Sequence, residues 1–480
     1  MDRLSRVDGN QSIQPMHIFL VVVLLSVVFG LLFIILKFDT TIVIAVAIGI
    51  AIVVFSFVEP KYAIFILIFS MLLSPEYGQR STEGSGATLR LEDFFLSIIT
   101  FIWFLKMALK KDLGLILKTN LNGPIFIYIA MCCLSTLWGM IGGRVNPTTG
   151  TLHVIKYLQY YVMFFMIINN IDSKQTLRQF MTVMFITAFI VAIVALAQIP
   201  GGERISAPFE GSEGGEPNTL GGYLTLMLGP AIALFLFSPN ALFRAIFAGL
   251  SGLLMIPLLY SQSRSSWVAF GVMYLVMLIV STRRSVLFVG LIAGIVILPL
   301  IAPSSVIDRF QYTFSGQEET LDVERAQLGE LTLDASTSER FDAWKRVWND
   351  LPKHPFIGFG ITGWKFLDAQ YAKVIIETGV FGLIFFLYLK FVVLKNLWSV
   401  YRRDDYEDWI FRGLSLGAFC ATFGMLAHAF GANTFIIVRI MEPFWLLVGM
   451  VMMVPEMISS DKVIIEKYKP VGFTKTSELT

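Results

Sequence analysis

Long apolar runs recur along nearly the whole chain, and this pattern limits the possible folds more than any other feature. Each run of about twenty residues is long enough to cross the hydrocarbon core of a bilayer as a helix. Backbone groups in lipid must bond to one another, so such runs predict a helical bundle, whereas a barrel would show short alternating segments. Only 15% of the residues are charged, far fewer than in a soluble domain. The sequence predicts an all-α polytopic membrane protein.

The apolar runs predict about fourteen transmembrane helices, or about twelve if the shortest runs are re-entrant. The first run follows a polar leader and is too long for a signal-peptide core, so we expect it to be retained as a helix. The expected spans are 17–36, 40–58, 61–74, 93–109, 124–142, 151–169, 178–199, 217–237, 245–260, 266–281, 285–302, 372–391, 411–430 and 434–454.

Lysine and arginine are concentrated in alternate loops, and this asymmetry predicts the orientation of the bundle. Both termini fall on the basic side, which we interpret as the cytoplasm. The opposite loops hold only Lys37, Arg80, Arg90, Arg144, Arg204 and Arg264. The basic loops hold Lys61, Lys106, Lys110, Lys111, Lys118, Lys174, Arg178, Arg244, Arg283, Arg284, Lys395, Arg402, Arg403 and Arg412.

This topology divides the chain into four parts. Residues 1–302 form the first part of the bundle, with an outward loop at 200–216. Residues 303–371 form a large polar loop on the periplasmic or extracellular side, 372–455 the last helices, and 456–480 a cytoplasmic tail. The large loop holds the densest set of reactive side chains, so we expect it to form a lid and part of an active site.

The large loop contains one amphipathic segment, 338–351, followed by a turn-rich passage, 352–364. Aromatic and leucine residues recur at helical spacing in the first, which predicts a helix on the membrane surface or on the bundle. This helix can be a packing helix with a solvated face or a lid over a substrate, and the two interpretations are compatible. Its apolar residues are Phe341, Trp344, Trp348 and Leu351.

Three arginines are expected near the outward mouth of the bundle. Arg204 lies in a glycine-rich loop, Arg264 in the segment SQSRSSW, and Arg340 at the start of the predicted surface helix. Guanidinium groups bind phosphate bidentately, so this set suits a phosphate or pyrophosphate head group. Ordinary snorkelling of arginine at the membrane interface is the alternative interpretation.

Acid–base candidates lie at the boundary between the loop and the next span. Asp368 comes just before that span, and Glu377 lies about two turns further in. A partly buried carboxylate there could accept a proton from a sugar hydroxyl. A solvated residue at a helix start is the alternative. His354, the only histidine of the loop, is a further candidate for a base or a substrate contact, although its neighbours also suit a plain turn.

Charged residues inside the last two spans form a third group. Arg439 and Glu442 are spaced to share one helix face, with His428 and Asn433 nearby in the sequence. Charges inside a membrane span are costly and indicate a functional role such as substrate contact. An ion pair that fixes the packing of the bundle is the structural alternative.

No cofactor or metal is expected. The chain has no P-loop, no dinucleotide-binding glycine pattern and no metal-ligand spacing, and its three cysteines lie inside apolar runs. The basic residues are scattered by topology, so no nucleic-acid partner is expected.

Four segments resemble the family of O-antigen ligases and Wzy-type polysaccharide polymerases, in matching order. They are the Arg204 loop ending in Pro217-Asn218, SRSSW at 263–267, ERFDAWKRVW at 339–348 with the following HPFIGFGITGW, and DAQYAKVIIETGVFG at 368–382. The ligases carry a His-Asn pair followed by Gly-x-x-Gly. Here Gly379 and Gly382 match the glycines, whereas Asp368 and Ala369 stand where the His-Asn pair would be.

The resemblance implies a membrane glycosyltransferase of the bacterial inner membrane that uses a glycan on undecaprenyl pyrophosphate as donor. An acceptor hydroxyl would attack the anomeric carbon with inversion and without a metal ion. Arg204, Arg264 and Arg340 would hold the pyrophosphate, and Asp368 would be the base. Gln370 and Tyr371 would bind sugar hydroxyls. A glycan acceptor, the lipid bilayer, a flippase and a chain-length regulator are the partners that this chemistry implies.

Because an aspartate replaces the histidine, we favour a polymerase that joins repeat units into O-antigen or exopolysaccharide. A ligase that moves finished glycan onto a lipid or protein acceptor is the alternative within the same chemistry. A transporter of a lipid-linked or anionic substrate is an alternative of another class, based on Arg439, Glu442 and Lys156. The absence of a clear internal repeat argues against it.

Overall fold

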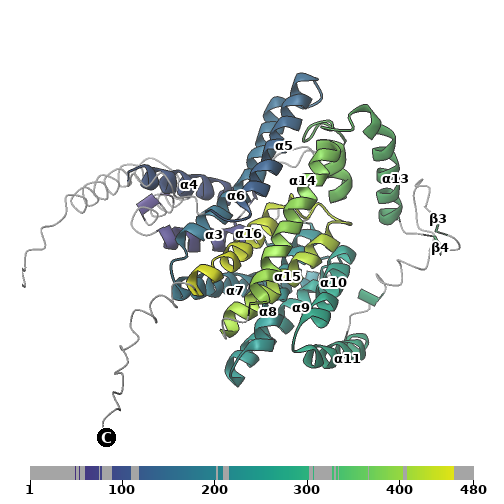
Figure 1. The fold of residues 1–480 in the computed structure, drawn as a ribbon. Helices are drawn as coiled ribbons and strands as arrows, with labels where there is room; N and C mark the ends of the chain where they lie inside the picture. Colours follow the sequence, from purple (N-terminus) through teal and green to yellow (C-terminus); the bar gives the residue numbers. More distant parts are fainter. Residues whose placement is uncertain are drawn as a thin grey trace, which may run out of the picture.

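The protein is described by a computed structural model, which covers residues 49, 53–54, 60–74, 76–77, 89–109, 118–201, 204–208, 216–301, 306–307, 327–328, 331–332, 335–365, 367–403 and 408–458. Helices make up nearly all regular structure there (Figure 1). Two antiparallel pairs of two-residue strands, β1 (Glu76–Tyr77) with β2 (Leu89–Arg90) and β3 (Gln327–Leu328) with β4 (Leu331–Thr332), complete it. The predicted all-α class is confirmed.

In the part of the chain that the structure describes, eight helices are long and apolar enough to cross a membrane. The predicted polytopic bundle is therefore confirmed, and the first two predicted spans, 17–36 and 40–58, lie almost wholly outside the described residues. The eight are α5 (Asn122–Ile141), α6 (Pro147–Asn170), α7 (Lys174–Leu196), α8 (Pro217–Phe237), α9 (Ala241–Tyr260), α14 (Gln370–Tyr401), α15 (Trp409–His428) and α16 (Val438–Met452). The other apolar helices are α3 (Pro60–Leu73), α4 (Leu91–Leu109), α10 (Arg264–Val280) and α11 (Arg284–Ile301).

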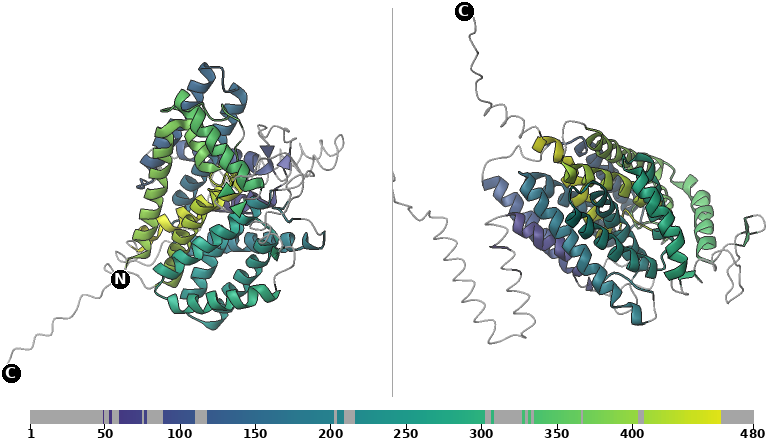
Figure 2. Two further views of the ribbon diagram at one scale, coloured as in Figure 1. Left: turned by 90° about the vertical axis from the view of Figure 1, so that its right-hand side faces the viewer. Right: turned by 90° about the horizontal axis from the view of Figure 1, so that it is seen from below.

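Helices α8, α15 and α16 form the buried centre of the bundle (Figures 1 and 2). Glycine allows α8 and α15 to approach closely: a Cβ on Gly417 would lie 2.3 Å from the Cα of Pro230. Small residues at such contacts are typical of helix association in membranes, where close van der Waals packing replaces the hydrophobic effect. This rigid centre carries the connections from which the candidate site is built.

Helix α14 is broken at Gly379, whose φ of 71° and ψ of −174° are not helical. The turn-rich segment after α13 (Ala335–Asp350) and the short η2 (Leu351–Lys353) bonds to the freed groups. Phe359 and Gly360 donate to the carbonyls of Ile376 and Glu377, at 3.0 and 2.9 Å. The break is thus satisfied by backbone from the large loop, as irregular backbone in a membrane protein must be.

Beyond the break, α14 continues to Tyr401, ten residues past the predicted end at 391. The predicted span ended at 391, before Lys395 in the predicted basic loop. The ammonium group of Lys390 is buried among aromatic rings, with its Nζ 3.9 Å from the centroid of Phe435 and 5.1 Å from that of Phe386. Cation–π attraction in a desolvated setting stabilises this charge, so the helix continues.

Candidate active site

Helix α13 brings Arg340 to the bundle. Its buried residues Ala343, Val347 and Leu351 pack against the start of α14. The predicted helix is confirmed. The side of α13 that packs on the bundle lies next to, and not on, the aromatic side expected from the sequence. Phe341 and Trp348 of that aromatic side are 43% and 57% exposed. These aromatic side chains remain available to a membrane surface.

The side chain of Arg340 is anchored on the connection between α15 and α16. Its Nη2 donates to the carbonyl oxygen of Gly431 at 2.8 Å. A Cβ placed on Gly431 would lie 3.0 Å from the Cβ of Ser265 and 3.8 Å from the Cζ of Arg340. The guanidinium group therefore lies close to the turn that precedes α10, where Arg264 is the first helical residue.

Asp368 lies just before α14 and is largely buried. Burial raises the pKa of its carboxyl group above the ordinary value, and the charge of Glu216 raises it further. The charge of Arg340 and a hydrogen bond from the backbone N–H of Asn433 lower it, without cancelling the effect of burial. The structure thus brings two of the predicted catalytic residues, Arg340 and Asp368, into one electrostatic environment.

Arg204 approaches the same turn from the other side. Its Nη2 donates at 3.2 Å to the carbonyl oxygen of Gln262, two residues before Arg264. Gln262 has a φ of 51°, so the turn between α9 and α10 is tight. Arg204, Arg264 and Arg340 therefore lie around one turn, and their predicted role in binding an anion stays a prediction.

A chain of polar side chains underlies this turn. Asn218 accepts from the hydroxyl of Ser263 at 2.7 Å, and Ser263 bonds to Ser266, also at 2.7 Å. Ser266 then bonds to His428 Nε2 at 3.0 Å, and His428 Nδ1 to the hydroxyl of Thr434 at 2.7 Å. The chain joins α8, α10 and the connection after α15. It fixes the two backbone segments on which Arg264 and Arg340 depend.

This polar chain was not predicted as a unit. The sequence singled out Asn218, the SRSSW segment and His428, but it grouped His428 with Arg439 and Glu442 in the last two spans. The structure places His428 with the serines of α10 instead. Which hydroxyl lies opposite a buried histidine depends on helix packing, which a single sequence does not reveal.

Gln370 and Tyr371 hold the connection between α15 and α16. The Gln370 side chain accepts from the backbone N–H of Phe435 at 2.9 Å, and the Tyr371 hydroxyl donates to the Leu426 carbonyl at 2.7 Å. The Tyr371 ring also packs 4.7 Å from that of Phe430. In this arrangement both side chains position the backbone around Gly431, and their predicted contact with sugar hydroxyls stays a prediction.

Arg439 and Glu442 are fully buried in α16, away from the surface. Arg439 donates to the carbonyl oxygens of Pro208 and Ser74, at 2.8 and 3.0 Å. It thereby ties the segment that carries Arg204 to the centre of the bundle. Their predicted role in substrate contact and their predicted mutual ion pair stay predictions.

His354 lies at the end of η2, where its ring meets the edge of Phe359 at 4.7 Å. Partial burial lowers the pKa of this imidazole, and the charge of Arg144 lowers it further. Its environment is thus that of the turn-rich segment and the α5–α6 connection. Within the described part of the chain, no three histidine, cysteine, aspartate or glutamate side chains come together to hold a metal ion.

The comparison with protein families decides how these residues are interpreted. Residues 249–387 match the O-antigen ligase family model. The resemblance predicted from the sequence is confirmed over this stretch. It runs from within α9 to within α14 and includes Arg264, Arg340 and Asp368, whereas Arg204 and His428 lie outside it. No curated protein matches the chain.

The O-antigen ligase match gives the two glycines of α14 a physical meaning. A Cβ on Gly379 would lie 2.3 Å from the backbone of Phe356, whereas one on Gly382 would overlap the Thr378 side chain of the same helix. Gly379 has a positive φ that other residues rarely adopt. Gly379 therefore marks the point where the turn-rich segment docks into the broken helix, and Gly382 leaves room for a side chain one turn before it.

Proposed function

We propose that this protein is a membrane glycosyltransferase that polymerises repeat units carried on undecaprenyl pyrophosphate. The observation that supports this most directly is the gathering of three arginines around one turn, with the buried carboxyl group of Asp368 beside Arg340. The O-antigen ligase match supports a glycan-transferring chemistry in general.

In the proposed reaction, a hydroxyl oxygen of the acceptor glycan forms a bond to the anomeric carbon of the donor sugar. The bond from that carbon to the pyrophosphate oxygen breaks, and the configuration inverts. Asp368 takes the proton of the attacking hydroxyl. Arg204, Arg264 and Arg340 stabilise the charge that develops on the leaving pyrophosphate, a task that requires donors already in place.

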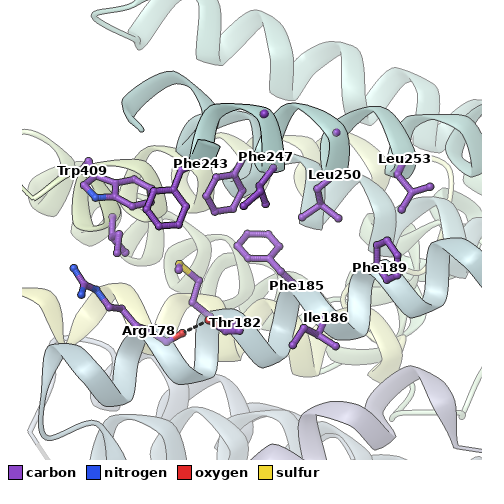
Figure 3. A pocket seen from close by; sticks show the side chains of 15 residues that line it. Arg178, Thr182, Phe185, Ile186, Phe189, Phe243, Phe247, Leu250, Leu253 and Trp409 are labelled. Carbon is purple, nitrogen blue, oxygen red and sulfur yellow. Dashed lines mark hydrogen bonds between the residues drawn. The ribbon is translucent and has the colours of Figure 1, made fainter. Parts of the chain in front are cut away.

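An apolar groove between α7 and α9 supports the proposed lipid carrier. Phe185 and Phe247 face one another in it, and Arg178 lies at one end (Figure 3). Its volume is about 880 Å³. From Leu253 in the groove, the remaining part of α9 rises about 10 Å toward the turn before Arg264. A polyprenyl chain whose pyrophosphate lies at the arginines could extend into this groove.

The orientation proposed for the enzyme follows from its basic loops. We place it in the bacterial inner membrane with both termini in the cytoplasm and the arginines facing the periplasm. A flippase would supply the donor at that face, and a chain-length regulator would act on the product. Labelling of single cysteines by a membrane-impermeant reagent at Thr148 and at Asn240 tests this, because only the first should react from outside.

The proposed activity is tested with purified protein in detergent, undecaprenyl-pyrophosphate-linked repeat units, EDTA and no nucleotide. A ladder of longer glycans supports a polymerase that needs no metal. Transfer only after addition of a lipid or protein acceptor supports the ligase alternative. Intact substrate under both conditions contradicts glycan transfer.

The transporter alternative is favoured by the burial of Arg439 and Glu442 inside the bundle. Under that alternative, Arg439→Ala abolishes activity, whereas Arg264→Ala and Asp368→Ala leave it intact. The reverse pattern is expected for the enzyme, with Arg264→Ala and Asp368→Ala losing turnover.

Turnover is expected to fall on acidification, and Asp368→Asn is expected to lose turnover while retaining donor binding. The base has to be ionised, so the activity that it supports is present above its pKa and is lost as the pH falls through it. Because burial raises this pKa, the loss should begin at a higher pH than for an ordinary aspartate. Turnover of Asp368→Asn equal to that of the original protein would contradict the role.

A second variant, Glu216→Gln, tests whether Asp368 is the group whose titration sets the acidic limb of the rate profile. Glu216 raises the pKa of Asp368, so its neutralisation should move the acidic limb of the rate profile to lower pH. Asp342→Asn is the matched control, because Asp342 pairs with Lys345 on α13 and is not among the groups that shift Asp368. The same displacement in both variants would argue against Asp368 as the titrating group.

A further inference from the structure

A polar cavity lies where the connection after α5 meets the turn-rich segment between α13 and α14. It has a volume of about 470 Å³. None of the residues assigned to glycan transfer lines it. The lining residues are Arg144, Asp350, Phe359, Thr362, Gly363, Trp364 and Lys365.

Arg144 is held in place by backbone groups. Its Nε donates to the carbonyl oxygen of Phe359 at 3.5 Å and its Nη2 to that of Trp138 at 3.3 Å. Two of its five N–H donors are thereby engaged, and the planar group is oriented at the cavity wall. Lys365 contributes a second cation and is exposed. The cavity therefore presents two positive charges, one of which is anchored by backbone carbonyl groups.

The negative charge of Asp350, the one carboxylate among the lining residues, is offset by neighbouring side chains. Asp350 pairs with Lys353 at 2.6 Å and accepts from the indole Nε1 of Trp364 at 3.0 Å. These two contacts, together with the charges of Lys353 and Lys365, hold the pKa of Asp350 below its usual range, so the group stays ionised and paired. With this charge offset, Arg144 and Lys365 leave a net attraction for an anion.

Thr362 supplies the neutral part of the cavity. Its Oγ1 is buried, and no hydrogen-bond partner for it occurs among the described residues. The residue has a φ of 66°, and its backbone N–H donates to Glu377 at 3.0 Å, which fixes the backbone of the cavity wall in this position. Because the hydroxyl oxygen is closed to solvent, a ligand in the cavity meets this part of the wall by packing and not through that hydroxyl.

We propose that this cavity binds an acidic sugar unit of the glycan substrate, with the carboxylate on Arg144 and Lys365 and the sugar ring packed beside Thr362 and Trp364. The inference rests on the proposed glycan transfer and names the substrate class. The cavity is linked to the transfer site through α14: Thr362 is bonded to Glu377, and Glu377 lies about 10 Å along the helix from Gln370. An oligosaccharide chain reaches from one to the other.

The test measures the binding of a free uronic-acid-containing tetrasaccharide to purified protein by calorimetry, with its carboxyl-reduced form as the matched probe. The acidic probe is expected to bind about tenfold or more tightly than the reduced one, the effect of one charge-assisted hydrogen bond. Lys365→Gln and Arg144→Gln should each remove most of this difference.

Lys345→Gln is the control variant, because Lys345 is an exposed lysine of α13 that does not line the cavity. Since Arg144 also holds backbone groups, Lys365→Gln keeps the test valid if Arg144→Gln does not fold. Equal binding of the two probes, or an unchanged difference in Lys365→Gln, would overturn the proposal. The probes carry no lipid and are bound without being transferred. The binding result can therefore be interpreted even if the glycan-transfer assay fails.

Discussion

Arg340→Ala is expected to lower the turnover of lipid-linked glycan by about 100-fold or more, the usual cost of removing one preorganised donor at a developing charge. Arg340 is placed on Gly431 by a 2.8 Å hydrogen bond, and its charge favours the ionised form of Asp368. Its loss should therefore weaken both the proposed leaving-group interaction and the proposed base, Asp368. Initial rates at saturating and limiting donor would separate the loss of turnover from the loss of binding.

Arg346→Ala is the matched control for Arg340, because Arg346 is an exposed arginine of the same helix. It should keep full turnover. Arg340→Lys keeps the charge but not the planar fork, so an intermediate rate is expected if bidentate binding of pyrophosphate matters. A lowered melting temperature in Arg340→Ala with a normal rate per folded molecule would assign Arg340 to stability alone.

The helical bundle could be predicted from the sequence because the backbone N–H and C=O groups of a membrane span have to hydrogen-bond to one another. Apolar length alone therefore placed helices such as α8, predicted and observed at 217–237. The rule misplaced the end of α14, which was predicted at 391 and lies at Tyr401. Lys390 is accommodated by aromatic rings from α14, α16 and the preceding connection, which are brought together only by the fold.

The charged residues of the candidate site could be predicted from the sequence, whereas the side chains that fix their positions could not. Arginines on outward loops stand out in an apolar sequence, and Arg264 and Arg340 were found in this way. The side chains that hold them, such as Ser266 and His428, are ordinary residues of helices. Their meaning comes from the 3.0 Å contact between them, across 162 positions of sequence.

The role of the broken helix α14 gives the second large prediction: Gly379→Ala is expected to destabilise the protein by at least about 1–3 kcal/mol from backbone strain alone. Gly379 has φ 71° and ψ −174°, a conformation that residues with a Cβ rarely adopt. The added methyl group would also lie 2.3 Å from the backbone of Phe356, which has no room to move without breaking the bonds of the turn-rich segment.

Gly271→Ala is the control, because a Cβ there meets nothing within 4 Å and alanine favours a helix. Thermal unfolding in detergent, followed by the fluorescence of the nine tryptophans, should give a lower melting temperature for Gly379→Ala and an unchanged or higher one for Gly271→Ala. An unchanged melting temperature in Gly379→Ala would mean that the segment after α13 does not dock into the break.

Asp368 and Arg340 flank that segment on both sides in the sequence, so its release should also cost turnover. A variant that melts earlier and loses activity in parallel would show that the glycine maintains the site by holding the loop in the helix.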